Sequence, residues 1–312
     1  MIVKPLLASL GLGLGLLSRA SAEDSSNFDC GTNAAHASEH FISTLESLHS
    51  PQANGSPAAR AAAHYSVLNA REKDNNTAIT IDAVFHIVAK TSKKSDITNE
   101  MPSSQLDALN NAYKEYGISF NLINVTWNTN DAWAVGEPPA DSEMKKTLRQ
   151  GTYRTLNLYF QTDLTGGVLG RCTLPSPIAN GKSDASAYAN DGCNVNANTM
   201  PGGSLEDYNS GKTAVHETGH WLGLLHTFEG NSCEGPGDYI DDTPFEREAT
   251  DGCPVSPPKM TCPGQKGADG KEVSIDPIHN FMDYSTDACY EGFTKLQHDR
   301  MHFMYNLYRD GN

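Results

Sequence analysis

The sequence is poor in basic side chains and in long hydrophobic runs. Its 312 residues include 23 lysines and arginines against 38 aspartates and glutamates, which gives a formal net charge of −15 at pH 7. Such a chain cannot gain affinity for nucleic acid by neutralising phosphates, so we expect no nucleic-acid partner. Because the long apolar stretch stands at the N-terminus, we expect no membrane partner for the mature chain. Hydrophobic residues make up 38% of the chain. When glycine is added, this share reaches the usual apolar content of globular proteins, so the chain is not disordered over its whole length.

The first 22 residues are predicted to be a secretory signal peptide. Lys4 supplies the positive charge, residues 6–17 form the apolar region, and Ala20-Ser21-Ala22 offers the small residues of a cleavage site. A buried N-terminal helix is the alternative, but glycines at alternating positions of this stretch disfavour it. We therefore expect a secreted, extracellular protein. Three sequons agree with export and are candidate glycosylation sites: Asn54, Asn75 and Asn124.

A change of composition divides the mature chain. Residues 23–77 hold few large apolar side chains, with one short helical stretch at 34–48 and then a run rich in proline, alanine, glycine and asparagine. This composition is typical of a prosegment with a linker, in which Arg60 and Arg71 are candidate processing sites. Periodic hydrophobic signal then begins, so residues 78–312 are predicted to form the globular domain.

Strands and helices alternate in the first half of that domain. Five elements are predicted, in the order strand, helix, strand, helix, strand: 79–88, after Pro102, 118–127, 141–150 and 156–160. Ser103 or Ser104 can cap the first of these helices. The order indicates an α+β fold with a mixed sheet packed on helices. A further helix is expected over 211–225, an irregular region follows it, and Thr294 with Gln297 forms a capping box for the last helix.

One motif carries recognisable chemistry. Residues four apart share a face of a helix, so His216 and His220 can direct ring nitrogens at one ion. Gly223 permits a backbone conformation that ends the helix, and His226 can then reach the same ion from another direction. Three neutral imidazoles with an open fourth position describe a catalytic zinc site. Glu217, rotated about 100° around the helix, can accept a proton from water there.

The other histidines are weaker candidates. His36 and His40 belong to an inverted zinc motif in the prosegment, for which a solvated helix face is the simpler interpretation. His298 and His302 are also four apart, and we interpret them as polar residues on the outside of the last helix. His86 is expected to be a hydrogen-bonded core residue in the first strand.

The histidine motif resembles that of the metzincin metallopeptidases. Asn280-Phe281-Met282-Asp283-Tyr284 is similar to their Met-turn, which places a methionine beneath the three histidines. Residues 212–230, 241–244 and 278–301 resemble the pappalysin family in particular, above all its fungal extracellular metalloproteases, and the resemblance runs from about residue 79 to residue 308.

This resemblance implies a secreted zinc endopeptidase that hydrolyses peptide bonds of extracellular proteins. It implies one catalytic zinc ion at the three histidines, Glu217 as general base, and Tyr284 as a side chain that moves between the metal and the reaction intermediate. The implied fold is metzincin-like: a twisted mixed sheet with an active-site helix and an irregular, disulfide-linked C-terminal subdomain, so residues 78–312 become the metalloprotease catalytic domain. Protein or peptide substrates would bind along an edge strand, which we place at 194–199.

Seven cysteines in an exported chain indicate disulfides and one thiol left over. Six cysteines allow fifteen pairings, and their spacing does not choose among them. The family resemblance implies Cys233 with Cys262 and Cys253 with Cys289, which leaves Cys172 and Cys193 as the third pair.

Cys30 is then unpaired, in the prosegment. A thiolate binds zinc well, so Cys30 is a candidate latency ligand for the fourth position, similar to the cysteine switch of matrix metalloproteases. That switch has an arginine where this chain has Asp29, whose charge disfavours a thiolate. A zymogen switch and an incidental thiol therefore both stay open.

Four carboxylates crowd a glycine-rich stretch and are candidate Ca²⁺ ligands: Glu234, Asp238, Asp241 and Asp242. A solvated acidic loop is the alternative. Two other classes of function also stay open. A binding or adhesion module could keep the zinc fold without needing Glu217 or Tyr284, and a zinc-stabilised structural domain would need a fourth protein ligand.

Overall fold

The computed structural model describes residues 28–49, 77–178, 185–265 and 275–310. The predicted signal peptide, Asn54, Asn75, Arg60 and Arg71 lie outside the described residues. Within the described part, no helix combines the length and the apolar character that crossing a bilayer requires.

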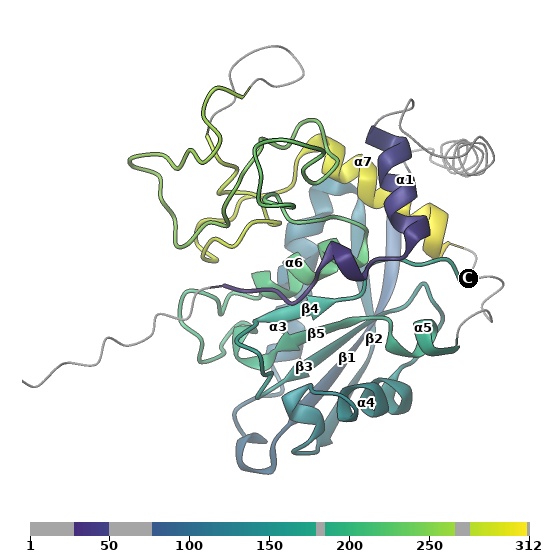
Figure 1. Cartoon of the computed structure of the whole chain (residues 1–312). Coiled ribbons are helices and arrows are strands. Elements are labelled where there is room, and N and C mark those ends of the chain that lie inside the picture. Colours follow the sequence, from purple (N-terminus) through teal and green to yellow (C-terminus); the bar gives the residue numbers. More distant parts are fainter. Residues whose placement is uncertain (1–27, 50–76, 179–184, 266–274, 311–312) are drawn as a thin grey trace, which may run out of the picture.

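A five-stranded sheet organises the globular domain (Figure 1). Its strands are β1 (Ile79–Ala89), β2 (Ile118–Thr129), β3 (Leu156–Gln161), β4 (Gly170–Cys172) and β5 (Cys193–Asn196). The order across the sheet is β2-β1-β3-β5-β4, with all neighbours parallel except β4, which runs antiparallel to β5. The predicted α+β fold with a mixed sheet is confirmed.

The expected position of the edge strand is wrong. We placed the edge at 194–199, but β5 lies inside the sheet between β3 and β4. Residues 170–172 follow a glycine-rich segment, pair antiparallel with β5 and form the short outer strand β4. A strand of three residues is too short to show a period-two pattern, so no sequence pattern indicates it.

The helices are α1 (Glu39–His49), α3 (Met101–Tyr113), α4 (Ala140–Leu148), α5 (Ala185–Asn190), α6 (Lys212–Trp221) and α7 (Lys295–Met304). A π-helical segment, Tyr305–Arg309, continues α7. Shorter 3-10 turns occupy Ala34–His36, Thr91–Lys93, Lys114–Tyr116, Trp133–Val135 and Ala197–Thr199.

Two of these helices test the predicted caps. The last helix, α7, begins at the predicted capping box, with both Thr294 and Gln297 hydrogen bonds formed. The prediction for α3 is wrong, because the helix begins before Ser103 and its N-cap is Glu100. Pro102 fits the first turn, where its missing N–H has no helical partner to lose.

The main core lies between the sheet and helices α3 and α6. Side chains of β1 and β3 that are fully buried, among them Ile81, Phe85 and Phe160, pack with Leu109 of α3 and Trp221 of α6. Tyr113 also donates a hydrogen bond to the Val215 carbonyl oxygen across this interface, at 2.8 Å. The sheet and α3 therefore fix the position of α6.

A second hydrophobic cluster joins the N-terminal segment to the C-terminal helix. Phe41 and Leu45 of α1 pack with Phe303 and Met304 of α7 and with Tyr308. Figure 1 shows α1 beside α7, although the two helices stand at opposite ends of the sequence. Three disulfides staple the less regular parts: Cys172–Cys193 joins β4 to β5, and Cys233–Cys262 and Cys253–Cys289 lie after α6. The last two are the pairs that the family resemblance implied, and the first is the pair that then remained.

Candidate metal centre and active site

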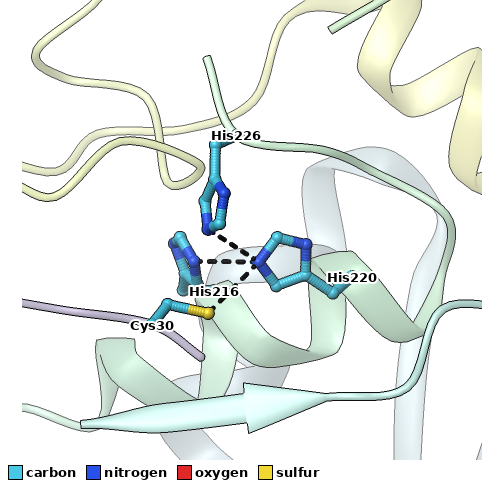
Figure 2. A group of neighbouring side chains, drawn as sticks. All are labelled: Cys30, His216, His220 and His226. Atoms are coloured by element: carbon cyan, nitrogen blue, oxygen red, sulfur yellow. Dashed lines mark hydrogen bonds between the residues drawn. The ribbon is translucent and has the colours of Figure 1, made fainter. Parts of the chain in front are cut away.

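Helix α6 carries two of the three clustered histidines. The turn that follows its C-terminal end positions the third, His226. His216 and His220 lie one turn apart on α6, and both are fully buried. After α6 ends, Gly223 adopts φ +91°, and a Cβ atom there would lie 2.5 Å from Cγ of Met304. The turn therefore needs glycine both for its conformation and for space. It brings His226 back toward the helix (Figure 2).

The three imidazoles converge through their Nε2 atoms. The Nε2 atom of His220 lies 3.1 Å from that of His216 and 3.1 Å from that of His226. The Nδ1 atoms of His216 and His220 are directed at the carbonyl oxygens of Phe281 (2.7 Å) and Leu224 (2.9 Å). A ring that donates through Nδ1 keeps a lone pair on Nε2. Lone pairs facing one another at this distance need a cation between them.

This donor set fits zinc. Ligand nitrogens at 2.0–2.1 Å from a tetrahedral zinc ion are about 3.3 Å apart, close to the separations found here. Burial, and then the neighbouring His226, lowers the pKa of both His216 and His220 well below the usual range, so both rings are the neutral ligands that a metal requires. Carbonyl oxygens that hold the Nδ1 protons are the usual outer partners of such ligands.

Cys30 completes the cluster. Its Sγ atom lies 3.5 Å from Nε2 of His220, and the ligand atoms of Cys30 and the three histidines all lie within 4.8 Å of one another. The thiol is buried and is not in a disulfide. In Figure 2 it approaches the three rings from the N-terminal segment.

Glu217 lies next to this cluster, buried beneath β4. Burial raises the pKa of its carboxyl group to about 8, while the nearby Cys30 and Thr32 side chains oppose the increase. The Thr32 hydroxyl donates to Oε2 at 3.4 Å. A Cβ atom on Gly170 would lie 2.3 Å from Oε1 of Glu217, so only glycine leaves room for the carboxylate here. The sequence analysis did not identify Gly170 or Thr32 as site residues. The glycine-rich sequence before β4 was the signal that could have indicated Gly170.

The predicted Met-turn lies under α6. Met282 is fully buried, and a Cβ atom on Gly219 of α6 would lie 2.5 Å from its sulfur atom. Two residues later, the Tyr284 hydroxyl lies 3.4 Å from Nε2 of His226. The same hydroxyl accepts from the Cys30 N–H at 3.0 Å and donates to the Cys30 carbonyl oxygen at 3.1 Å.

The N-terminal segment occupies the outer edge of β4. The Gly31 N–H donates to the Gly170 carbonyl oxygen at 2.8 Å, and the Leu169 N–H donates to the Asp29 carbonyl oxygen at 2.7 Å. Cys30 and Gly170 form a parallel bridge. Asp29 is exposed.

The other histidines have structural partners. His86 is fully buried and its ring lies 2.8 Å from the Thr126 hydroxyl and 3.0 Å from Asn157 Oδ1, so the prediction of a core residue is confirmed. His36 and His40 are both exposed, as the solvated interpretation predicts, and Nδ1 of His40 also lies 2.8 Å from the Tyr308 hydroxyl. His302 is buried and its Nε2 lies 2.7 Å from the Tyr116 carbonyl oxygen, so the outward-facing interpretation is wrong for this residue.

The four carboxylates proposed for calcium have separate surroundings. Asp242 accepts from the Thr294 hydroxyl and the Leu296 N–H at the start of α7. Asp241 pairs with His49 at 3.3 Å, and Asp238 accepts from the Ile240 N–H. Among the described residues, these carboxylates do not gather into a common ligand set. The remaining candidate sequon residue, Asn124, is exposed on β2.

Comparisons with known proteins agree with this geometry. Residues 140–306 match the peptidase M43 family model, described as pregnancy-associated plasma protein-A. An extracellular metalloprotease of Aspergillus oryzae is 44% identical over 79% of this chain and 82% of its own length. One of Podospora anserina is 39% identical over 97% of both chains.

Two solved structures share the fold. Mature mirolysin of Tannerella forsythia, in complex with a cleaved peptide, has a TM-score of 0.59 at 23% identity and covers 75% of this chain and 96% of its own. A promirolysin variant has a TM-score of 0.63 at 22% identity, over 89% and 93%.

The fold and the histidine cluster define a metalloprotease. The chain belongs to peptidase family M43, the pappalysins. The extracellular localisation predicted from the leader is confirmed by relatives that are extracellular metalloproteases.

Proposed function

We propose that this metalloprotease is a zinc endopeptidase that is made as a zymogen and hydrolyses peptide bonds of extracellular proteins. The observation that carries the proposal is the convergence of three imidazoles, with Nε2 of His220 3.1 Å from Nε2 of His216 and 3.1 Å from Nε2 of His226. His216, His220 and His226 would hold the zinc ion. When bound, zinc would supply Lewis-acid activation of water and of the scissile carbonyl group.

Glu217 would move the proton. Its carboxylate accepts a proton from the attacking water and returns it to the nitrogen atom of the leaving amine. A pKa raised to about 8 by burial lies near neutral pH, where one group can both accept and return a proton. Gly170 leaves space for the carboxylate beside β4. The Tyr284 hydroxyl would donate a hydrogen bond to the carbonyl oxygen as negative charge develops on it.

The edge of β4 would bind the substrate main chain. An exposed edge strand recognises an extended peptide by backbone hydrogen bonds. In this structure the same edge pairs with residues 29–31. We therefore propose that residues 23–77 form a prosegment, of which residues 29–31 occupy the substrate edge, ahead of a catalytic domain at 78–312.

Cys30 would be the latency ligand. Its sulfur atom lies in the histidine cluster. The backbone N–H of Cys30 donates a hydrogen bond to the Tyr284 hydroxyl. Burial, and then the charge of Glu217, raises the pKa of the thiol well above its usual range. A coordinated cation overcomes such an effect, because a thiol that binds a metal ion loses its proton. The prosegment would thus block the zinc ligand position, Tyr284 and β4 together.

A structural zinc site is the second candidate, because Cys30 provides the fourth protein ligand that such a site needs. The two functions differ in what happens when residues 28–49 are removed. A catalytic site keeps its zinc and gains activity, whereas a structural site loses zinc and stability.

The test is zinc analysis together with peptide hydrolysis by the processed protein, with Glu217→Gln as the matched variant. We expect about one zinc ion per chain in both proteins and loss of hydrolysis in the variant. Hydrolysis that survives Glu217→Gln would remove the catalytic assignment, and a processed protein without zinc would favour the structural alternative.

A further inference from the structure

The N-terminal segment contacts the globular domain at two separate places. Residues 28–32 lie along β4 and the histidine cluster, where Phe28 packs with Tyr208 and Tyr284. Residues 39–49 form α1 and lie on the C-terminal helix, in a different hydrophobic cluster. The second place has no part in the chemistry of the histidines.

The α1 contact is a built hydrophobic site. Phe41 and Leu45, four residues apart on one face of α1, are both fully buried. The groove that receives them is formed by side chains from four parts of the domain: Tyr153, Leu174, Ile178, Leu225, Phe303, Met304 and Tyr308. Side chains buried to this extent contribute strongly to holding one element on another.

Polar contacts fix the register of α1 in this groove. The Tyr308 hydroxyl lies 2.8 Å from Nδ1 of His40 and 3.1 Å from the Thr44 hydroxyl. The Thr44 side chain is itself buried. The far end of α1 is less closely packed, since Leu48 and His49 border a cavity of about 450 Å³ beside α7. The buried side chains of the attachment are Phe41, Thr44 and Leu45, and His49 adds a contact with Asp241 at 3.3 Å.

An isolated helix of eleven residues is marginal in water. The groove accordingly stabilises both the position and the helical form of α1. The two contacts are joined by the short stretch 33–38, so each raises the effective concentration of the other. Residues 50–76 connect α1 to the segment that leads into β1.

We propose that the groove between α7, Leu225 and Tyr153 is a docking site for α1 that keeps residues 28–49 bound after the chain has been cut between residues 50 and 76. The cut protein is a two-fragment complex. It stays latent until α1 is itself destroyed or displaced, and this latency rests on the proposed function. Retention of the fragment does not depend on that function.

The test uses the full chain carrying Glu217→Gln, to prevent self-cleavage, and a recognition sequence for a site-specific protease placed in the linker. After the cut, the protein is diluted and passed over a size-exclusion column, and mass spectrometry detects the N-terminal fragment. We expect the fragment to elute with the domain. The same run with a zinc chelator removes any contribution of Cys30 and should still show retention.

Two variants probe the groove. The double variant Phe41→Ala, Leu45→Ala should raise the dissociation constant of the fragment roughly a hundredfold. Glu46→Ala, on the exposed face of the same helix, is the matched control and should retain it. Tyr308→Phe keeps the ring on the domain side and removes only the shared hydroxyl, so it tests the groove without changing α1. Roughly tenfold weaker retention is expected.

The proposed docking site is refuted if the fragment dissociates from the unmodified complex as readily as from the Phe41→Ala, Leu45→Ala complex. With Glu217 intact, the cut protein should be inactive and the cut double variant active in peptide hydrolysis. Retention together with full activity of the cut protein would overturn the latency and leave the docking site standing. If neither protein hydrolyses peptides under any condition, the proposed function fails while the elution result still decides the docking site.

Discussion

Gly170 on the outer strand and Glu217 on α6 lie in contact, so that a Cβ atom on Gly170 would be 2.3 Å from Oε1 of Glu217. The same Cβ atom would lie 2.6 Å from Cγ and 2.7 Å from Cδ of that side chain. The strand on which we propose that substrate lies therefore also sets the position of the proposed general base. A side chain at position 170 would push the carboxylate away from the histidines.

Gly170→Ala should therefore lower kcat/KM for peptide hydrolysis by the processed enzyme. A displacement of about 1 Å can cost a factor on the order of 10² in rate, and we expect a loss of that size. The zinc content should not change, because Gly170 does not touch the histidine rings. Val168→Ala, in the same segment, is the control and should keep near-normal activity. An active Gly170→Ala enzyme would contradict the assigned position of the base.

The Tyr284 hydroxyl, on the Met-turn, lies 3.4 Å from Nε2 of His226. If it stabilises the developing oxyanion, Tyr284→Phe should reduce kcat by roughly 10²–10³ and leave KM and zinc content nearly unchanged. Tyr290→Phe is a matched control on the same loop, since its hydroxyl donates instead to the Asp283 carbonyl oxygen at 2.6 Å. It should cost about 1 kcal/mol of stability and little activity. Equal kinetics in the two variants would exclude the role of Tyr284.

The intact precursor offers a test of Cys30. Cys30→Ala removes the sulfur from the histidine cluster but leaves the backbone pairing with β4 and the α1 contact in place. We expect only partial activation of the unprocessed precursor, roughly tenfold and well below the processed enzyme, because the fourth ligand position opens while residues 29–31 still pair with β4. Cys30→Ser provides a comparison of similar volume. A Cys30→Ala precursor that stays as latent as the unmodified protein would support an incidental thiol.

The metal cluster was predictable because its signal is local. His216 and His220 are held together by one helical turn, and Gly223 ends the helix within three further residues, so spacing alone indicates convergence. The strands β1, β2 and β3 were equally readable, since each is long enough to show its buried pattern. The disulfide partners came from the family resemblance, not from their spacing.

The rest depends on contacts between distant parts of the chain. β4 is three residues long, and its place at the sheet edge is decided by pairing with β5. Cys30 meets Tyr284 across 254 positions of sequence. The packing of α1 against Tyr308 is also a long-range contact, since Thr44 and Tyr308 are 264 positions apart in the sequence. No local pattern carries information about such pairs.

Asp238 gives a prediction for stability against pH. It is buried, and its Oδ1 accepts a hydrogen bond from the Ile240 N–H at 3.0 Å. Burial raises the pKa of its carboxyl group to about 8, although Arg300 and Thr243 oppose the increase. In the unfolded chain the pKa is about 3.9. Between these values the folded state binds more protons than the unfolded state, so this group makes stability fall as pH rises.

Asp238→Asn should remove that pH dependence. Because the slope for one proton is about 1.4 kcal/mol per pH unit, the variant should gain at least about 1 kcal/mol over the unmodified protein between pH 5 and pH 7.5. The measurement is the free energy of unfolding in urea at both pH values, on the unprocessed protein. Asp251→Asn replaces an exposed carboxylate of the same region and serves as the control. If the Asp238→Asn protein loses stability with pH as steeply as the unmodified one, Asp238 is ionised in the fold and its carboxylate must have a cationic partner.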